Sequence, residues 1–341
     1  MTESTRRVTI VDVAAHAGVS TAAASKVLRN AYGVSAQMRA KVESAIEELG
    51  YRPLASARGM RGKTFTIGVL VSDLHNPFFA LLVDGMAEVV EASGYELLVG
   101  PGGASEAAQG RMIEAMADRQ MDGLLLIAPV VESGALSAIA GRTPTVVIGR
   151  HGPADEYDTV AGDDLAGSAA IVDHLVSLGH ERIAYLTHTD AANSDPRLPQ
   201  RVRERGYREA MDARGLGDRI DVVPSQWSDA GGRATVRALL ERAELPTAVH
   251  AGADVAAYGM LTELWDRGRS VPDEISVVGY DDTPTAALPP VSLTSVDQSG
   301  HEMGASAARL LLERFEGRTE AQHVLTSPTL IPRRTSGPPR A

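Results

Sequence analysis

The chain has 341 residues, of which 44% are hydrophobic and 23% charged, a composition typical of a soluble globular protein with more than one folded unit. It contains no cysteine, which excludes disulfides, zinc–thiolate sites and thiol catalysis and fits a reducing compartment. No apolar run approaches the roughly 18 residues of a membrane helix, and residues 1–7 are polar, so we expect a cytoplasmic protein with no membrane partner.

The net charge of −11 is distributed unevenly along the chain. Residues 1–63 contain ten Lys or Arg and five Asp or Glu, a net charge of +5, whereas the remainder contains 23 and 39, a net charge of −16. A basic N-terminal part on an acidic body is what a protein needs if its N-terminal part contacts DNA phosphates. Chance clustering of charge is the alternative.

A first helix is predicted to begin after Thr9. Thr9 and Asp12 have the spacing of a capping box, in which the two side chains bond to each other's backbone N–H groups. Val11, Ala14 and Ala15 are then expected to form one apolar face of this helix.

A glycine turn and a second helix follow. Gly18 suits a turn that needs positive φ, and Ser20 can cap the next helix, whose apolar positions are Ala23, Ala24, Val27 and Leu28. Two helices joined in this way are typical of the helix-turn-helix DNA-binding motif. In that motif the second helix enters the major groove, which would place Thr21, Ala22 and Lys26 against base edges. A helical hairpin with no role in DNA binding is the alternative.

Ser35 can cap a third helix that ends at Gly50. Its expected buried face consists of Met38, Val42, Ala45, Ile46 and Leu49. Residues 54–63 hold little that could bury itself, so they form either a linker or a helix that folds only against a partner.

From Phe65 onward, short apolar strands alternate with helices. Strands are predicted at 66–71, 96–100, 123–128, 145–149, 182–187, 221–223, 248–251 and 275–278, and helices at 78–92, 107–119, 133–140, 165–178, 203–214, 230–242 and 255–267. This alternation predicts right-handed βαβ units and Rossmann-like parallel sheets. Because the pattern occurs twice, we expect two lobes with a ligand cleft at the carboxyl ends of their strands, lined by residues 72–77, 149–151 and 279–282.

Many short segments share their order and spacing with one known family. Among them are TIVDVA (9–14), AGVS (17–20), SKVL (25–28), LGYRP (49–53), NPFF (76–79), DGL (122–124) and VVGYDD (277–282). Together they resemble the lactose-repressor/galactose-repressor (LacI/GalR) family of transcription regulators over about residues 8–333.

The resemblance implies an all-α head joined to an α/β body. The implied parts are a lambda-repressor-like helix-turn-helix domain at 1–52, a hinge helix or linker at 53–63, and a bilobed periplasmic-binding-protein-like domain at 64–333. Lobe 1 would comprise about 64–162 and 296–324, and lobe 2 about 163–295 and 325–333. Residues 334–341 are expected to form a disordered tail, and because this tail has no heptads, we expect a homodimer.

The resemblance also implies a repressor that binds a near-palindromic double-stranded DNA operator. Its implied DNA contacts are Ser20, Thr21, Ala22, Ser25, Lys26, Asn30, Tyr51, Arg52, Arg58 and Met60. Thr21, Ala22 and Lys26 would contact bases, and Met60, where the family usually has Leu, would insert into the minor groove. Ala23 and Ala24 replace a usual Thr-Val pair.

A small-molecule effector, often a sugar or a nucleoside-like molecule, is implied in the cleft. Its implied contacts are His75, Asn76, Phe78, Arg150, Arg203, Trp227, Asp254, Asp281 and Gln298. The planar fork of Arg203 suits either vicinal hydroxyls or a carboxylate. Three positions depart from the family pattern: Ala253 stands where Asn is usual, Gly149 where an acid is common, and Asp164 where Asn is usual. The first two remove polar contacts, which argues against an ordinary hexose.

No catalytic site, cofactor or metal is expected. The segment 101–103 lacks the Lys-Ser/Thr of a phosphate loop, no Gly-x-Ser-x-Gly occurs, and the nine histidines lack metal-ligand spacing. Two alternatives remain: a regulator whose body binds no effector, and a solute-binding protein, which would have no use for residues 8–63.

Overall fold

The computed structural model describes residues 8–28, 32–51, 63–189 and 195–340. The chain divides between Thr64 and Phe65 into two units, a head and a body. Among the described residues, the head contains helices α1 (Ile10–Ala17), α2 (Thr21–Leu28) and α3 (Ala36–Leu49). The fold class predicted from the sequence, a helix-turn-helix head on a parallel-sheet α/β body, is confirmed.

Local capping determines where the head helices begin and end. Thr9 donates its backbone N–H to Asp12 Oδ2 at 2.8 Å, and Asp12 donates its own to Thr9 Oγ1 at 3.4 Å, which completes the predicted capping box. Gly18 then ends α1 with φ of 66°, and the Ser20 hydroxyl accepts from the backbone of Ala23 at the start of α2.

Of the three residues predicted for the apolar face of α1, Ala14 is buried and the other two are wrong. Val11 is 58% exposed and Ala15 is also exposed. The side chains that pack into the head core are instead Ile10, Val13, Ala14 and Ala17, which have the i, i+3, i+4, i+7 spacing of one helical face. They pack against Ala24 and Val27 of α2 and against Val42 and Ala45 of α3.

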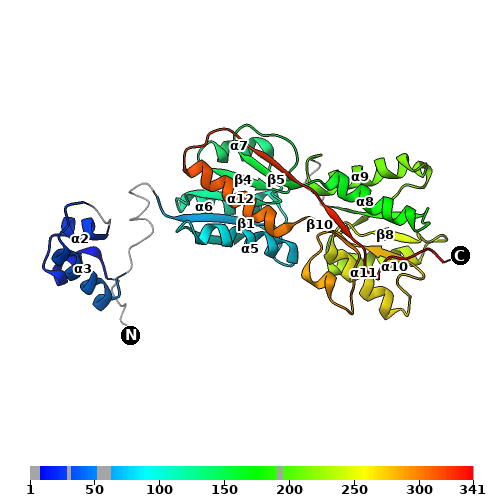
Figure 1. Cartoon of the computed structure of the whole chain (residues 1–341), viewed down its shortest axis with the longest axis horizontal. Helices are drawn as coiled ribbons and strands as arrows, with labels where there is room; N and C mark the ends of the chain where they lie inside the picture. Colours follow the sequence, from blue (N-terminus) through cyan, green and yellow to red (C-terminus); the bar gives the residue numbers. More distant parts are fainter. Residues whose placement is uncertain (1–7, 29–31, 52–62, 190–194, 341) are drawn as a thin grey trace. The chain divides into compact units, whose positions relative to one another are not determined.

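The body has two lobes, each with a parallel sheet between helices (Figure 1). Lobe 1 begins with β1 (Thr66–Val71), α5 (Pro77–Glu91), β2 (Glu96–Pro101), α6 (Glu106–Asp118), β3 (Gly123–Ile127), α7 (Ser133–Ala140), β4 (Thr145–Ile148) and β5 (Asp158–Gly162). Lobe 2 contains α8 (Asp164–Ser177), β6 (Ile183–His188), α9 (Pro199–Ala213), β7 (Asp221–Ser225), α10 (Asp229–Leu240), β8 (Ala248–His250), α11 (Asp254–Asp266) and β9 (Ser276–Val278). The chain ends with β10 (Ser295–Asp297), α12 (Gly300–Phe315), β11 (His323–Thr326) and β12 (Thr329–Ile331).

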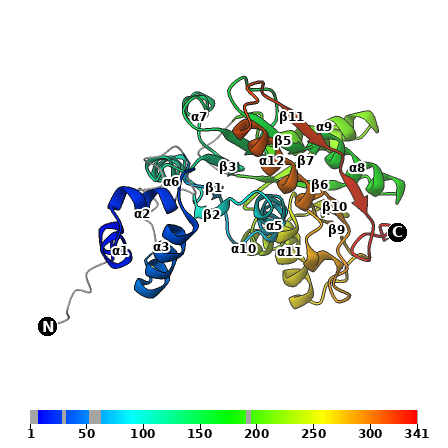
Figure 2. The same cartoon turned by 60° about the vertical axis from the view of Figure 1, so that its left-hand side comes forward.

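The sheet of lobe 1 has the strand order β11-β5-β4-β3-β1-β2, and that of lobe 2 the order β7-β6-β8-β9. The chain crosses between lobes before α8, after β10 and between β11 and β12, and β10 pairs antiparallel with β12 (Figure 1). Successive residues of β1 pack on opposite faces of the sheet, with Val69 in the core under α5 and α12 and Leu70 in the core with α6 and α7. Helices α5 and α12 lie side by side (Figure 2), and Gly85 and Gly304 let their backbones approach closely.

Most predicted elements are found within two residues of their predicted bounds. Helix α9 begins four residues earlier than predicted, because Pro199 occupies its first turn, where a missing N–H costs nothing. Strand β5 and the elements after β9 were not predicted. Residues 334–340 are not disordered as predicted: the Thr335 hydroxyl donates to the Val277 carbonyl at 2.7 Å, and the Gly337 carbonyl bonds to His180 at 2.8 Å. These bonds fix the segment along lobe 2.

Candidate functional site

The exposed side of α2 is the candidate DNA-binding surface of the head. Thr21, Ala22 and Lys26 are all exposed, and the buried side of the same helix faces the head core. Ser20 is exposed and caps the helix. Ser25 is buried, at 9% exposure, so little of its surface could reach a phosphate.

Tyr51 is half-buried and packs against the head core, so its role in DNA binding is limited to its exposed edge. Four predicted DNA contacts lie outside the described residues: Asn30, Arg52, Arg58 and Met60. The predicted hinge at 53–63 lies outside them as well, except for Lys63.

A cavity of about 460 Å³ lies between the two lobes of the body. Its walls come from the carboxyl ends of strands in both sheets, as expected for paired parallel sheets. Lobe 1 contributes a largely apolar wall that includes Phe78, Phe79, Leu82, Ile127, Ala128, Val130, Ile148 and Gly149. Lobe 2 contributes a more polar wall that includes Asp164, His188, Gln200, Arg203, Gln226, Trp227 and Asp281.

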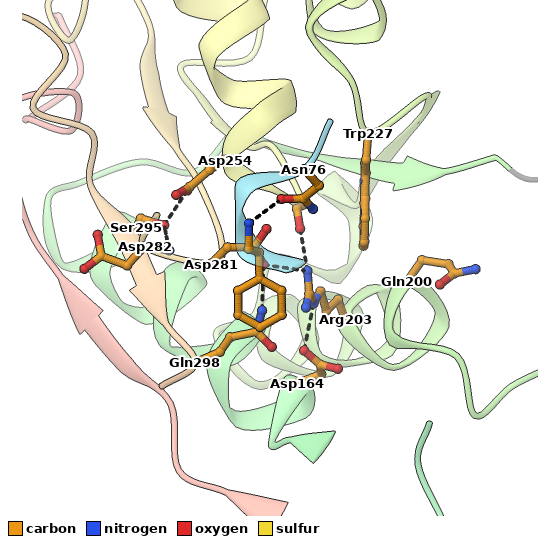
Figure 3. Close-up of polar contacts among 12 residues, drawn as sticks. Asn76, Asp164, Gln200, Arg203, Trp227, Asp254, Asp281, Asp282, Ser295 and Gln298 are labelled. Carbon is orange, nitrogen blue, oxygen red and sulfur yellow. Dashed lines mark hydrogen bonds and ion pairs between the residues drawn. The ribbon is translucent and has the colours of Figure 1, made fainter. Parts of the chain in front are cut away.

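Arg203 is the centre of the polar wall (Figure 3). Its Nε donates to Asp164 Oδ1 at 2.7 Å, and its Nη1 donates to the Gly252 carbonyl at 2.8 Å. The guanidinium carbon lies 3.7 Å from the ring centre of Tyr280 and 5.1 Å from that of Trp227. The guanidinium is therefore held in place by an ion pair, a carbonyl and two aromatic rings.

Asp164 connects Arg203 to lobe 1. It lies at the start of α8, and its second oxygen bonds to His151 Nε2 at 2.7 Å. Burial opposes the charge of Asp164, but Arg203 and His151 keep its pKa below the ordinary value. The carboxylate therefore stays ionised between Arg203 and His151.

Asp281 lies on the other side of Arg203, with Oδ1 3.8 Å from Arg203 Nη1. This oxygen accepts from Gln298 Nε2 at 2.6 Å. Asp281 Oδ2 is buried and has no hydrogen bond from the described residues, although Asn76 lies close enough to lower the pKa. Burial is the dominant effect, and it raises the pKa of Asp281 above its ordinary value.

Six of the nine predicted effector contacts line the cavity: Asn76, Phe78, Arg203, Trp227, Asp281 and Gln298. The other three do not. His75 has a 93% exposed side chain and bonds to Asp73, which itself lies at the rim. Asp254 is buried beneath the wall, where it accepts from Ser295 and from the backbone of Thr283 (Figure 3).

Arg150 is also absent from the cavity wall. It is 1% exposed, and its guanidinium donates to the Val131 carbonyl and to the Ser133 hydroxyl, both at 2.9 Å. It forms an ion pair with Asp195 of lobe 2, which Arg197 shares at 3.0 Å. Arg150 is therefore a contact between the lobes.

Sequence reasoning missed several wall residues. Gln200 precedes Arg203 by three positions on α9, so the helical period could have placed both on one face. His188 and Gln226 follow strand ends and could have been found from strand position alone. Asp164 was noted only as a departure from a family pattern, and nothing local to it shows that it would pair with Arg203.

Comparisons with known proteins agree with this architecture. The sequence model described as "Bacterial regulatory proteins, lacI family" matches residues 9–53, and a periplasmic binding protein-like domain matches residues 172–336. The ribose operon repressor of Escherichia coli K12 is 34% identical over 332 residues, which cover 95% of this chain and 98% of the repressor. The chain belongs to the lacI family.

Solved structures of lacI-family proteins share the fold. The lac repressor dimer bound to operator and the anti-inducer ONPF is 25% identical, with a TM-score of 0.80 over 97% of this chain and 100% of that chain. A lacI-family regulator from Enterococcus faecium with bound ribose is 27% identical, with a TM-score of 0.71 over 80% of this chain and 99% of that chain.

None of the helices among the described residues of this lacI-family chain is both long and apolar enough to span a membrane. The same residues contain no group of three or more His, Asp or Glu side chains placed to hold a metal ion.

Proposed function

We propose that this lacI-family chain is a transcriptional repressor that binds a near-palindromic operator as a homodimer and responds to a sugar or related metabolite in the cavity between its lobes. The observation that carries the proposal is the joining of an exposed helix-turn-helix surface to a body whose two lobes together enclose a cavity. The relatives include a ribose operon repressor and a ribose-bound regulator. The proposal assigns the protein no catalytic reaction and a cytoplasmic location.

On DNA, the exposed side chains Thr21, Ala22 and Lys26 contact base edges while Ser20 and Tyr51 orient the head against the backbone. Thr21 and Ala22 are small, so apolar contact with a thymine methyl is their main contribution. The predicted contacts Asn30, Arg52, Arg58 and Met60 remain part of the proposal on sequence grounds alone.

In the body, a ligand that touches both walls of the cavity favours one angle between the lobes. Since the chain crosses between lobes at three places, a change of angle moves lobe 1, which connects to the head, relative to lobe 2. The ligand then shifts the population between dimers that fit the operator and dimers that do not, provided that its affinity for the two differs.

The regulator with a silent body receives less support. Two departures from the family pattern motivated it, but Ala253 is buried at the cap of α11 and does not line the cavity. The replacement of the usual Asn by Ala253 therefore removes no contact from the cavity wall. Gly149 does line the cavity, yet Gln200 and Gln226 supply polar groups to the opposite wall.

The test combines DNA selection with ligand screening. DNA bound by the full-length protein is selected from a random library at a stated salt concentration, and a palindromic consensus is expected. Thermal stability is then measured with sugars and nucleosides, and a rise in Tm with at least one of them is expected. A non-palindromic consensus would contradict the homodimer, and intact DNA binding without stabilisation by any compound would favour the silent body.

A further inference from the structure

The cavity contains little positive charge for its number of carboxylates. Arg203 is the one Lys or Arg among the described wall residues, whereas Asp73, Asp164 and Asp281 all belong to the wall. Residues 190–194, which the structure does not describe, contain no Lys or Arg in the sequence. A ligand in this cavity therefore has a single guanidinium available for any negative charge.

That guanidinium is already neutralised. Arg203 and Asp164 have side chains only 6% and 2% exposed, and their 2.7 Å contact is fixed by the Gly252 carbonyl and by stacking on Tyr280. If Arg203 turned toward an anion, it would leave Asp164 buried with a weaker partner, and an unpaired buried charge is strongly unfavourable. An anionic ligand that reached Arg203 would also meet the repulsion of Asp164 at short range.

Two arginines of the loops between the lobes are paired outside the cavity. Arg150 and Arg197 both pair with Asp195, and neither lines the cavity. The positive charges of Arg150 and Arg197 are therefore used at the contact between the lobes.

The remaining polar groups suit hydroxyls. Asp281 Oδ2 is a buried acceptor with no hydrogen bond from the described residues, so a ligand hydroxyl could satisfy it. Burial raises the pKa of Asp281, and when Asp281 is protonated the wall carries the compensated Arg203–Asp164 pair and the carboxylate of Asp73. In its ionised form the wall is net negative, so neither state offers an anion an unpaired cation.

His188 also lines this wall, and its Nδ1 accepts from the backbone N–H of Trp227 at 3.0 Å. Asn76, Gln200 and Gln226 supply uncharged amides.

We propose that the cavity selects an uncharged, hydroxyl-rich ligand over its phosphorylated or carboxylated counterpart, and that Asp164 sets this preference by holding Arg203. Asp164 is a positioning residue, because it acts through Arg203. This inference rests on the proposed function, since it names the charge class of the effector.

The test measures binding of matched pairs to the full-length protein by calorimetry. The pairs are D-ribose with D-ribose 5-phosphate, D-glucose with D-gluconate, and adenosine with adenosine 5′-monophosphate. In each pair that binds, we expect the neutral member to bind the wild type at least about tenfold more tightly, a difference that one uncompensated charge contact readily supplies.

Asp164→Asn is the informative variant, because Asn keeps the size of the side chain and removes the charge that neutralises Arg203. We expect the ratio of neutral to anionic affinity to fall by about tenfold or more, through a gain in anion binding. Asp173→Asn is the matched control: it removes an exposed carboxylate of the same helix, which pairs with Arg214 and does not line the cavity, so the ratio should stay unchanged.

The outcomes separate the two proposals. Anionic members that bind the wild type as tightly as their neutral counterparts would overturn this inference and leave an effector-controlled repressor standing. A folded Asp164→Asn protein with an unchanged ratio would overturn the role of Asp164. If Asp164→Asn fails to fold, the wild-type ratio alone still decides the charge preference. Absence of binding by every neutral member would overturn this inference and the effector part of the proposed function, and would leave the operator-binding part standing.

Discussion

Lys26 is the one charged side chain of α2, the helix proposed to enter the major groove, and it lies in the last turn of that helix. Its neighbours Thr21 and Ala22 are small, so they add shape and apolar contact but little electrostatic attraction. Much of the affinity for DNA must then come from Lys26, from phosphate contacts elsewhere in the head and from pairing of two heads. Substitutions of single head residues should therefore differ in how much they reduce the affinity for DNA.

We predict that Lys26→Ala weakens operator binding by roughly tenfold, because it removes a charged contact worth about 1–3 kcal/mol if it reaches a base. Fluorescence anisotropy on the selected operator measures the change. Lys41→Ala is the matched control, since Lys41 is an exposed lysine of α3 on the same head. Equal losses for the two variants would show that only total charge matters.

Arg203 offers a second prediction at this scale. Arg203→Ala should abolish ligand stabilisation in thermal-shift measurements, because it removes the donor at the centre of the polar wall and leaves Asp164 with His151 alone. Operator binding without ligand should persist. Retained stabilisation by the same ligand would place the binding site outside this cavity.

The helices and strands differ in how well the local sequence predicts their bounds and buried faces. The head helices start and stop where Thr9, Ser20 and Gly18 predict, because a cap depends only on residues within one turn. The buried face of α1 was mispredicted because eight residues give little periodicity, and packing against α2 and α3 selects the face. The elements after β9 were not predicted, because β10 and β12 are short and pair with each other across 30 or more residues of sequence.

For residues of the cavity wall, too, local sequence predicts some positions and not others. Strand ends place Asn76 and Asp281 at the cavity, since parallel strands share one carboxyl edge, whereas Arg203 was expected there only from the family resemblance. Arg150 also follows a strand end, yet it turns away to pair with Asp195, a partner 45 residues later. Nonlocal pairing of this kind has no local signal in the sequence.

The Arg150–Asp195 ion pair joins loops of different lobes, so it should stabilise their observed arrangement. Burial opposes the charge of Asp195, but Arg197 and Arg150 bring its pKa to about 2. We predict that Asp195→Asn lowers the free energy of unfolding by about 3 kcal/mol, because Arg150 is left buried with a neutral partner. Urea denaturation measures this loss. Asp155 is exposed and lies on the loop between β4 and β5 that also carries Arg150. Asp155→Asn should change the free energy of unfolding by less than about 0.5 kcal/mol.

At the scale of the whole molecule, Asp158 ties the last helix of lobe 1 to its sheet. Its carboxylate is fully buried at the start of β5 and bonds to Arg314 of α12, to Arg318 and to the backbone of Gln322. Burial opposes the charge, but these partners lower the pKa of Asp158 to about 2.

Since the folded pKa lies below the ordinary 3.8, the stabilisation is complete above that value and is lost as the pH falls toward 2. The expected loss is about 2 kcal/mol for this residue. Asp158→Asn should remove that part of the pH dependence in urea titrations between pH 5 and 2. Asp173→Asn, which breaks an exposed pair with Arg214, should leave the slope almost unchanged. Parallel slopes for wild type and Asp158→Asn would contradict the assignment.

We propose that occupancy of the cavity between the lobes controls operator binding by a dimer. Ligand and DNA must then be coupled reciprocally, and each must change the affinity of the protein for the other by the same factor.

The direct test is a titration of the full-length protein with its selected operator, repeated at saturating concentrations of a ligand that stabilises the wild type. We predict a change in operator affinity of at least about tenfold, equivalent to about 1.4 kcal/mol of coupling. The change should disappear in Arg203→Ala. A ligand that saturates the cavity and leaves the operator affinity of the wild type unchanged would contradict the account.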